Sequence, residues 1–345
     1  IMNIKALFKS LLLRKFTTGL LILQLSITLG LLVNSSILAF DTKHKIAQKT
    51  GLDNDNILII STHPTSGNYR DLDYYRSIAT QDMAKLSQLP GVNSVSVTNQ
   101  LPIATRGMLS NIHDLDNPEQ EKTDKYLQDI KYILTQEHLA DAMGFIMLEG
   151  RFLTKDDQLD FGSEEKRNIV ITESLKRALY GEESAIGQET NNGFIVGVIK
   201  DIILDPTLPA DKQYGLFINT IMEYIFVGRF YILNVEPQQM ASVRSQVSET
   251  ILAVQAERDI FRVFTMQERL KRFYRDDKGL ADLFLLLCGL MLFITAISSY
   301  AYSQFHISRQ QKFIGIRRAL GARKKDILFY VLTENWLVYS QRYLY

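Results

Sequence analysis

The chain has 345 residues, of which 46% are hydrophobic and 22% are charged, and its formal net charge is +1 at pH 7. These values fit a soluble protein, or a membrane protein whose apolar residues are concentrated in a few segments, and we expect no nucleic-acid partner. The single cysteine, Cys288, excludes a disulfide framework within the chain. Stability must therefore come from packing.

The first apolar segment covers residues 16–40 and contains no charged residue. It is long enough to cross a membrane as a helix. A cleavable signal peptide is the alternative, because basic residues precede the segment. However, its apolar part exceeds the usual signal core of about 7 to 15 residues, and no A-x-A-like site closes it. We predict a cytoplasmic N-terminus over residues 1–15 and a first transmembrane helix over 16–40.

A second uncharged segment covers residues 283–308, and it predicts a second transmembrane helix over 283–304. Basic residues precede the first span and follow the second span in the sequence. They are Lys5, Lys9, Arg14 and Lys15 before the first span, and Arg309, Lys312, Arg317, Arg318, Arg323, Lys324 and Lys325 after the second. Under the positive-inside rule both flanks are cytoplasmic, so the intervening residues lie on the outer side of the membrane.

The intervening residues 41–264 are long enough for a domain of two lobes. Hydrophobic periodicity and turn residues predict alternating strands and helices within them. The predicted strands cover residues 56–61, 92–99, 126–134, 168–171, 194–199, 226–235 and 261–264, and the predicted helices cover 71–89, 137–143, 173–179 and 240–254. A polar, turn-rich segment over 102–125 predicts a loop or a mobile insertion. The expected architecture is an α+β extracytoplasmic domain between α-helical transmembrane segments.

The return to the membrane carries a helix-start signal. Thr265 and Glu268 have the S/T-x-x-E spacing of a capping box, in which each side chain satisfies a free backbone amide. From there into the second span no proline occurs, and the only glycines are Gly279 and Gly289. We therefore predict a stalk helix over residues 265–282 that continues into the second span as one rigid rod.

Motifs for catalysis or metal binding are absent from the sequence. It contains no phosphate-binding loop, no dinucleotide-binding turn and no H-E-x-x-H pair. The five histidines, which lack the spacing of metal ligands, are His44, His63, His113, His138 and His306. Two acidic pairs are expected on solvated faces, Asp156 with Asp157 and Glu164 with Glu165. We predict no catalytic site and no metal site.

Several segments resemble one known family. The sequence IGIRRALGA at residues 314–322 looks like the cytoplasmic signature of MacB-type ABC transporter permeases, the FtsX-like permease family. Residues 89–102, 144–157, 168–189 and 195–201 resemble, in that order, the outer-domain pattern of the same family. The correct order of these segments between two spans of the correct orientation makes the resemblance specific.

The resemblance implies a short coupling helix in the cytoplasmic region 305–336, which docks in a groove of a separate ATP-binding cassette subunit. The implied residues are Ile314, Gly315, Ile316, Arg317, Arg318, Ala319, Leu320, Gly321 and Ala322. The apolar side chains suit a groove, and the arginines can pair with acidic groups or lipid phosphates. A basic amphipathic helix lying on anionic lipid is the alternative. Lipid attraction alone does not explain Gly315 and Gly321.

The resemblance also implies a function, that of the permease subunit of a MacB-type ABC transporter. ATP and Mg would bind to the partner subunit, so we expect neither enzymatic activity nor a cofactor in this chain. The coupling and stalk helices would pass movement to the outer domain by mechanotransmission, for the export of drugs, peptides, toxins or lipoproteins. We expect an inner-membrane protein with a cytoplasmic N-terminus and a periplasmic domain. Further expected partners are a second permease copy or sister permease, a periplasmic adaptor and an outer-membrane duct.

Two departures from the family pattern occur near the C-terminus. Phe313 stands where the family usually has glutamate. The family has four membrane helices, but Gln341 and Arg342 stand where apolar residues of a third are expected. We therefore expect residues 337–345 to be a truncated or aberrant C-terminus.

Two other classes of protein share the two-span topology. A membrane sensor with a periplasmic ligand-binding domain is the main alternative. Residues 309–345 lack the sustained heptad pattern that a signalling helix usually needs. A membrane-anchored enzyme is the third possibility, but the sequence provides no catalytic constellation.

Overall fold

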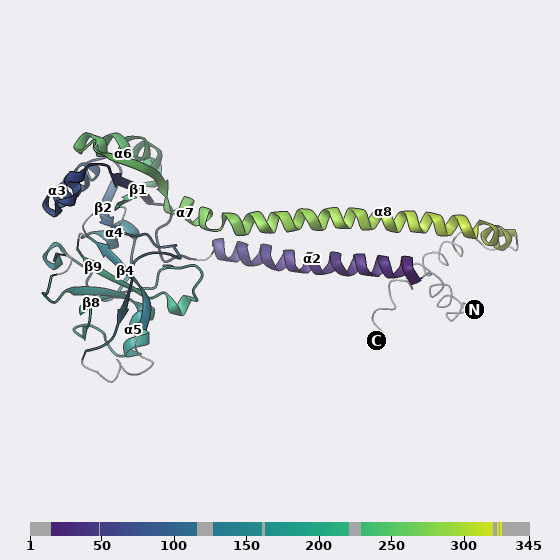
Figure 1. Ribbon diagram of the computed structural model, residues 1–345, viewed down its shortest axis with the longest axis horizontal. Coiled ribbons are helices and arrows are strands. Elements are labelled where there is room, and N and C mark those ends of the chain that lie inside the picture. Colours follow the sequence, from purple (N-terminus) through teal and green to yellow (C-terminus); the bar gives the residue numbers. More distant parts are fainter. Residues whose placement is uncertain are drawn as a thin grey trace. The chain divides into compact units, whose positions relative to one another are not determined.

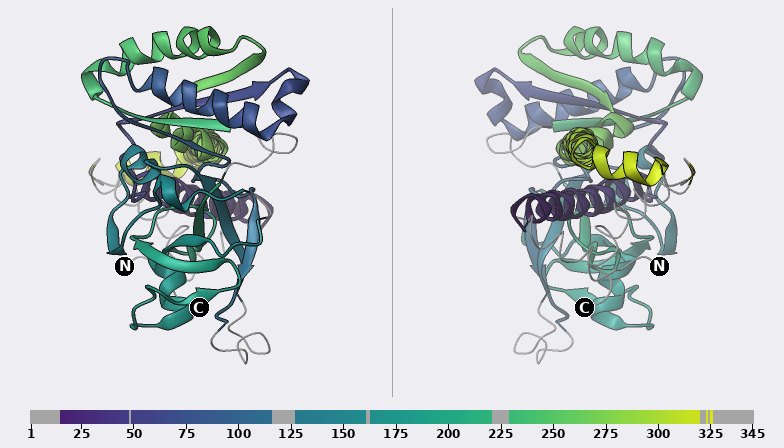
Figure 2. Two further views of the ribbon diagram at one scale, coloured as in Figure 1. Left: turned by 90° about the vertical axis from the view of Figure 1, so that its left-hand side faces the viewer. Right: turned by 90° about the vertical axis from the view of Figure 1, so that its right-hand side faces the viewer.

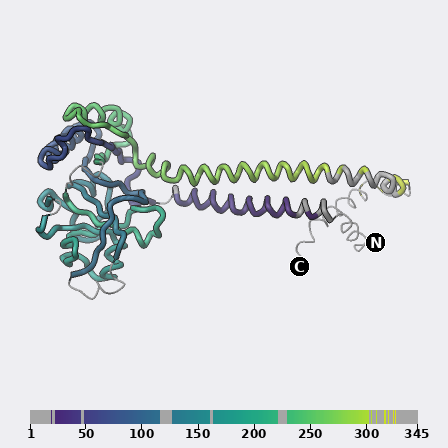
Figure 3. Tube along the Cα trace, in the orientation of Figure 1, coloured from purple at the N-terminus to yellow at the C-terminus, as the bar shows by residue number. Residues whose placement is uncertain are grey.

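The computed structural model describes residues 15–47, 49–115, 127–160, 163–220 and 229–319, together with Arg323 and Lys325. The chain divides into two compact units, which are described separately (Figure 1, Figure 3). We call Ile1–Ile46 together with Tyr274–Tyr345 the helical unit, and Ala47–Phe273 the sheet domain.

The described part of the helical unit consists of two long helices, α2 (Lys15–Ala47) and α8 (Arg275–Ala319). Each contains a stretch that is long and apolar enough to cross a membrane, Leu23–Lys45 in α2 and Arg275–Ala301 in α8. Large apolar side chains such as Phe40 and Phe293 are exposed on these helices, as expected for a surface that contacts lipid. The two predicted transmembrane segments lie within these helices.

The sheet domain contains eleven described strands and five described α-helices. The strands are β1 (Ile57–Pro64), β2 (Val92–Thr98), β3 (Leu109–Ile112), β4 (Leu127–Thr135), β5 (Met147–Gly150), β6 (Asn168–Thr172), β7 (Glu189–Thr190), β8 (Gly193–Ile199), β9 (Gly215–Asn219), β10 (Arg229–Val235) and β11 (Arg258–Thr265). The helices are α3 (Leu72–Leu86), α4 (Leu139–Met143), α5 (Glu173–Tyr180), α6 (Met240–Val254) and α7 (Met266–Phe273).

These strands form one sheet in the order β11-β1-β10-β2-β4-β9-β6-β8-β5, with β3 beside β4 and β7 beside β8. The sheet divides into two parts, because β2 and β4 share a single register pair, Thr98 with Thr135. Lobe 1 is the antiparallel set β11, β1, β10 and β2 with α3, α4 and α6. Lobe 2 contains the remaining strands and α5, and includes the parallel pairs β4 with β9 and β6 with β8.

Each lobe has its own apolar core. In lobe 1, α3 and α6 lie side by side over the strands (Figure 2, left), and Leu86 and Val247 pack with strand residues such as Leu58. In lobe 2, Leu175 of α5 packs against a separate cluster that includes Ile169. The predicted α+β domain of two lobes is therefore confirmed.

The predicted loop over residues 102–125 is wrong in part. It contains β3, and Ile103 and Ile112 within it are buried. Polar residues surround β3 in the sequence, so its four residues carry no clear period, and pairing with β4 creates the strand. Residues 116–125 lie outside the described ranges.

A second difference concerns the return to the membrane. The sequence predicts one continuous helix from Thr265 into the second span, but Tyr274 separates α7 from α8. Tyr274 is buried, and neither proline nor glycine marks the break. The interruption therefore depends on tertiary structure, which periodicity does not report.

A buried polar network joins α3 to the sheet of lobe 1. Asp82 of α3 pairs through both carboxylate oxygens with Arg258 of β11, and one of these contacts measures 2.7 Å. Tyr231 of β10 also donates its hydroxyl to Asp82. Burial raises the pKa of Tyr231, so this hydroxyl stays protonated and donates. Arg229 donates to the Tyr231 oxygen at 2.9 Å and to the Tyr75 carbonyl at 3.0 Å.

A second polar cluster surrounds the turn after β5. Asp157 is buried, so the prediction of a solvated face is wrong for this member of its pair. Its carboxylate accepts two hydrogen bonds from Arg151, at 2.6 and 2.8 Å, one from Asn168 at 2.7 Å, and one from the backbone N–H of Thr154 at 2.7 Å. Asp156 is exposed, as are Glu164 and Glu165.

This cluster predicts a pH-dependent contribution to stability. Burial opposes ionisation of Asp157, but the hydrogen bonds from Arg151, Asn168 and Thr154 outweigh it and hold the pKa of the carboxyl well below its usual range. The folded-state pKa is thus below the unfolded value of about 3.9. The contribution is fully present above about pH 4 and is lost as the pH falls further toward the folded-state pKa.

The measurement is the free energy of unfolding of the wild type and of Asp157→Asn between pH 7 and pH 3. We expect the wild type to be more stable at pH 7, and the difference to shrink below about pH 4. Asp156→Asn, at an exposed neighbour, is the matched control and should show no such pH dependence. A difference that stays constant down to pH 3 contradicts the assignment.

Candidate functional site

The segment that leads back from the sheet domain toward the second span, α7 (Met266–Phe273), begins with the two reciprocal hydrogen bonds of a capping box. We call it the return segment. The backbone N–H of Glu268 donates to Thr265 Oγ1 at 3.1 Å, and the backbone N–H of Thr265 donates to Glu268 Oε2 at 3.3 Å. Both bonds lie at the junction of β11 and α7. They fix the direction in which the chain leaves lobe 1.

Arg244 of α6 makes further hydrogen bonds to this junction. Arg244 donates to both carboxylate oxygens of Glu268, at 2.6 and 3.2 Å, and to the carbonyl of Val263 at 3.0 Å. The Arg244 guanidinium lowers the pKa of the Glu268 carboxyl, although burial acts in the opposite direction. Sequence reasoning missed Arg244, because it lies 24 residues before its partner and no local pattern links the two.

The two helices of the helical unit contact each other through polar side chains. Gln24 Nε2 donates to Thr295 Oγ1 at 3.1 Å, and the Ser35 hydroxyl lies 3.4 Å from the thiol sulfur of Cys288. The pairs run in opposite directions along the two helices, so α2 and α8 are antiparallel neighbours (Figure 1). Small and polar residues at such contacts permit close packing in a membrane.

The predicted coupling segment begins within the last turns of α8. The helix continues without interruption to Ala319, and its yellow end turns away from the axis of the rest (Figure 2, right). Gly315, Ile316 and Ala319 are exposed, and Ile316 is 57% exposed. The side chains of Ile314, Arg317 and Arg318, and all of Leu320, Gly321 and Ala322, lie outside the described part of the chain. The exposed apolar side chain of Ile316 is thus followed directly in the sequence by two arginines, Arg317 and Arg318.

Three of the four outer-domain segments singled out from the sequence come together in lobe 2, whereas residues 89–102 contain β2 of lobe 1. Residues 144–157 contain β5, residues 168–189 contain β6 and α5, and residues 195–201 contain most of β8. In the sheet, β8 lies between β6 and β5. The described residues contain no cluster of three or more metal-ligating side chains.

Comparison with protein-family models gives two matches. Residues 18–250 match the MacB-like periplasmic core domain, and residues 285–340 match the FtsX-like permease C-terminal segment. The chain belongs to the MacB-like family. It is a MacB/FtsX-like permease, as the motifs of residues 89–201 and 314–322 predicted.

Curated relatives of this MacB-like chain carry the name macrolide export ATP-binding/permease protein MacB. The protein from Wolinella succinogenes is 21% identical over 343 residues, which cover 97% of this chain and 50% of that protein. The protein from Bdellovibrio bacteriovorus is 24% identical over 205 residues, covering 55% of this chain and 30% of that protein. The chain thus spans about half, or less, of the length of these relatives.

Two crystal structures are also similar to the MacB-like chain. The periplasmic region of MacB from Actinobacillus actinomycetemcomitans is 15% identical, with a TM-score of 0.39, and the match covers 67% of this chain and 98% of that one. The extracellular domain of the noncanonic ABC-type transporter YknZ from Gram-positive bacteria is 11% identical, with a TM-score of 0.35, and the match covers 59% of this chain and 100% of that one.

Proposed function

We propose that this chain is the permease part of a MacB-like ABC transporter, in which ATP binding and hydrolysis on an ATP-binding cassette subunit move the sheet domain. The relatives are named as macrolide export ATP-binding/permease proteins, and the chain matches the family's periplasmic core and its permease segment. ATP and Mg then bind on the separate subunit. The cargo is a drug, peptide, toxin or lipoprotein in the periplasm.

The observation that carries this proposal is the continuity of α8. One helix holds both the apolar stretch Arg275–Ala301 and the exposed Ile316. An apolar side chain next to arginines suits a groove on a partner subunit, since burial of an isoleucine side chain is worth about 1.5–3 kcal/mol. A force applied at Ile316 therefore acts on α8, the helix that begins at Arg275, directly after the break at Tyr274.

The sheet domain offers a place where such a force produces movement. Its two lobes share the single register pair Thr98 with Thr135, whereas neighbouring strands within a lobe share several pairs, as β1 and β10 do. Two backbone hydrogen bonds join the strands at this point, from Asn99 N–H to the Leu134 carbonyl and from Gln136 N–H to the Val97 carbonyl, together with side-chain bonds such as that of Thr98 Oγ1 to the Leu134 carbonyl. The junction between β2 and β4 is therefore the proposed hinge.

The orientation follows from the basic flanks of the two spans. We place the N-terminus and the coupling segment in the cytoplasm and the sheet domain in the periplasm, with the spans in the inner membrane. A second permease copy or a sister permease completes the assembly, with an adaptor and an outer-membrane duct as further partners. The sensor alternative is disfavoured because residues 285–340 match a permease segment.

The test is a distance measurement between the lobes. In a Cys288→Ser background, nitroxide labels are placed at the exposed positions Ser245 in lobe 1 and Glu182 in lobe 2 by substitution with cysteine. The full chain is reconstituted with its ATP-binding subunit in nanodiscs. We expect a non-hydrolysable ATP analogue to change the distance distribution, and to have no effect without the subunit. An unchanged distribution in the complete assembly contradicts the proposal.

A further inference from the structure

The segment that follows α2 contacts one particular loop of lobe 2, residues 201–205. The backbone N–H of Ile203 donates to the carbonyl of Thr50 at 2.9 Å. Next to it, Gly51 has a φ of +76°, and a Cβ at this position would lie 2.5 Å from the carbonyl oxygen of Asp201. Only glycine allows this approach. The exit from the first membrane helix is therefore fitted closely against residues 201–205.

The return segment reaches the same loop by another route. Arg269 of α7 donates through Nε to the carbonyl of Pro102 at 2.7 Å. Directly after Pro102, the backbone N–H groups of Ile103 and Ala104 donate to the carbonyls of Ile203 at 3.2 Å and Leu204 at 3.0 Å. A short ladder of backbone hydrogen bonds thus connects α7 to residues 201–205.

Two groups on this route are held in unfavourable states. Ile103 is buried and has a φ of 60°, a conformation that is costly for a β-branched residue and persists only where its surroundings fix it. Burial lowers the pKa of Arg269 to about 10, and no carboxylate of the described residues offsets this effect. The backbone conformation of Ile103 and the burial of Arg269 both cost free energy, so the rest of the fold must hold these two residues in this one arrangement.

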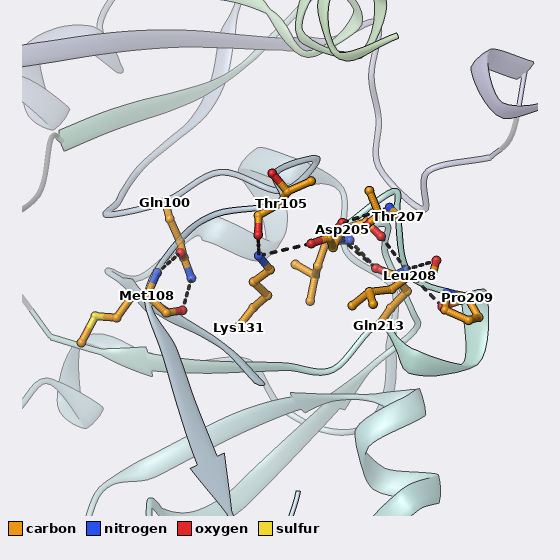
Figure 4. A network of polar contacts seen from close by, with 10 residues as sticks. Gln100, Thr105, Met108, Lys131, Asp205, Thr207, Leu208, Pro209 and Gln213 are labelled. Atoms are coloured by element: carbon orange, nitrogen blue, oxygen red, sulfur yellow. Dashed lines mark hydrogen bonds and ion pairs between the residues drawn. The ribbon is translucent and has the colours of Figure 1, made fainter. Parts of the chain in front are cut away.

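A buried ion pair closes the connection (Figure 4). Lys131 of β4 lies between the carbonyl of Thr105, at 3.2 Å, and the carboxylate of Asp205, at 3.6 Å. Both charged residues are buried. Because desolvation offsets most of the gain from such a pair, its main effect is to select one geometry rather than to add stability. Gln213 fixes the loop further, since its side chain bonds the N–H of Leu204 at 2.8 Å.

The far side of the loop acts on a helix of lobe 2. Asp201 accepts a hydrogen bond from the backbone N–H of Ser174 at 2.8 Å, and a second one from the Ser174 hydroxyl. Ser174 lies in the first turn of α5. A carboxylate at a helix N-terminus satisfies free amides and interacts favourably with the helix dipole. Movement of residues 201–205 therefore pulls directly on α5.

We propose that residues 201–205 form a relay, at which the segment after α2 and the α7 segment act together on α5 of lobe 2. Arg269 and Asp201 are its positioning residues. Arg269 connects α7 to the segment that bonds the relay, and Asp201 connects the relay to α5. The inference rests on the proposed function for the source of the movement. The mechanical link itself is a property of the sheet domain.

Amide hydrogen exchange on the full chain in nanodiscs tests the link without any ATP-binding subunit. Arg269→Met removes the bond to Pro102, and we expect exchange in peptides covering residues 101–106, 201–206 and 173–178 to become about tenfold faster, as for a loss of ~1.4 kcal/mol. Because coupling is reciprocal, Asp201→Asn should accelerate exchange in α7 as well as in α5.

Arg244→Met is the matched control, because Arg244 also holds the α7 junction but does not contact the relay. It should accelerate exchange near residues 263–268, and its effect on residues 201–206 should be much smaller than that of Arg269→Met, because the bond from Arg269 to Pro102 remains. The relay is overturned if the effect of Arg269→Met stops at residue 106, or if β1 exchanges faster by the same factor, which indicates general destabilisation. Should Arg269→Met not fold, the reciprocal variant decides, and an effect of Asp201→Asn confined to α5 overturns the relay.

The two proposals fail separately. If exchange shows the link but the distance between the lobes does not respond to nucleotide, the transport function is wrong and the relay remains. If the distance responds but exchange at residues 201–206 is unaffected by Arg269→Met, the relay is wrong and the function remains.

Discussion

Asp82→Ala is expected to destabilise the folded chain by about 3–5 kcal/mol, because it leaves the buried guanidinium of Arg258 without its counter-charge. Asp82, Arg258 and Tyr231 are all buried, and Asp82 accepts hydrogen bonds from both of the others. The carboxylate also accepts the hydrogen bond of the Tyr231 hydroxyl, whose oxygen in turn accepts one from Arg229. Its loss therefore also leaves a buried hydroxyl without its acceptor.

Thermal unfolding of the full chain, followed by the near-ultraviolet circular dichroism of its tyrosines, measures this effect. We expect Asp82→Ala to lower the midpoint by roughly 10 °C. Asp73→Ala is the matched control on the same helix, since its side chain is 96% exposed, and it should change stability by less than about 0.5 kcal/mol. Equal effects of the two substitutions contradict the buried-pair interpretation.

A double-mutant cycle separates the ion pair from simple packing. Removing Arg258 together with Asp82, as Asp82→Ala with Arg258→Met, eliminates both buried charges at once. We expect the double variant to be less destabilised than the sum of the two single variants, by at least about 1 kcal/mol. Additive losses show that the two residues contribute independently.

Asp82 also shows what the sequence allows. The buried positions of α3 are Tyr75, Ile78, Ala79, Asp82 and Leu86, which is the spacing of an apolar helix face. A charged residue on that face indicates a buried partner of opposite charge or a hydrogen-bond donor. The sequence therefore contains a signal for a buried polar contact at Asp82. The partner could not be predicted, because Arg258 lies 176 residues away in the sequence and only folding brings it to Asp82.

The same limit separates predicted from missed elements elsewhere. The helix α6 was predicted because its period persists over 15 residues. The strand β9 was missed, because its five residues are all buried and a short apolar run has no alternation. Sequence patterns therefore report long amphipathic elements well and short, fully buried ones poorly.

The candidate site follows this rule too. Thr265 and Glu268 are three residues apart, and their hydrogen bonds follow from a local pattern. The relay combines Thr50, the residues after Pro102, and the loop 201–205, which are distant in the sequence. The positive φ of Gly51 and its close approach to Asp201 appear only in the structure, because no local pattern in the sequence indicates either of them.

In the proposed transporter, Ile316→Asp is expected to weaken binding of the ATP-binding cassette subunit to the full chain by at least about tenfold. Two effects contribute: the partner groove loses the burial of an isoleucine side chain, and it must accept an unpaired carboxylate. A tenfold change corresponds to ~1.4 kcal/mol, which is below the expected burial term alone. Pairing this change with Leu320→Asp should abolish binding within the measurable range.

The measurement is the Kd between the subunit and the chain in nanodiscs, with ATPase activity recorded in parallel. Ile316→Leu is the matched control, because it keeps the apolar volume and should leave the Kd nearly unchanged. The alternative role, a basic helix on anionic lipid, gives a different pattern. In that case Ile316→Asp reduces binding of the segment to anionic vesicles and leaves the Kd for the subunit unaltered, because no protein groove receives the side chain.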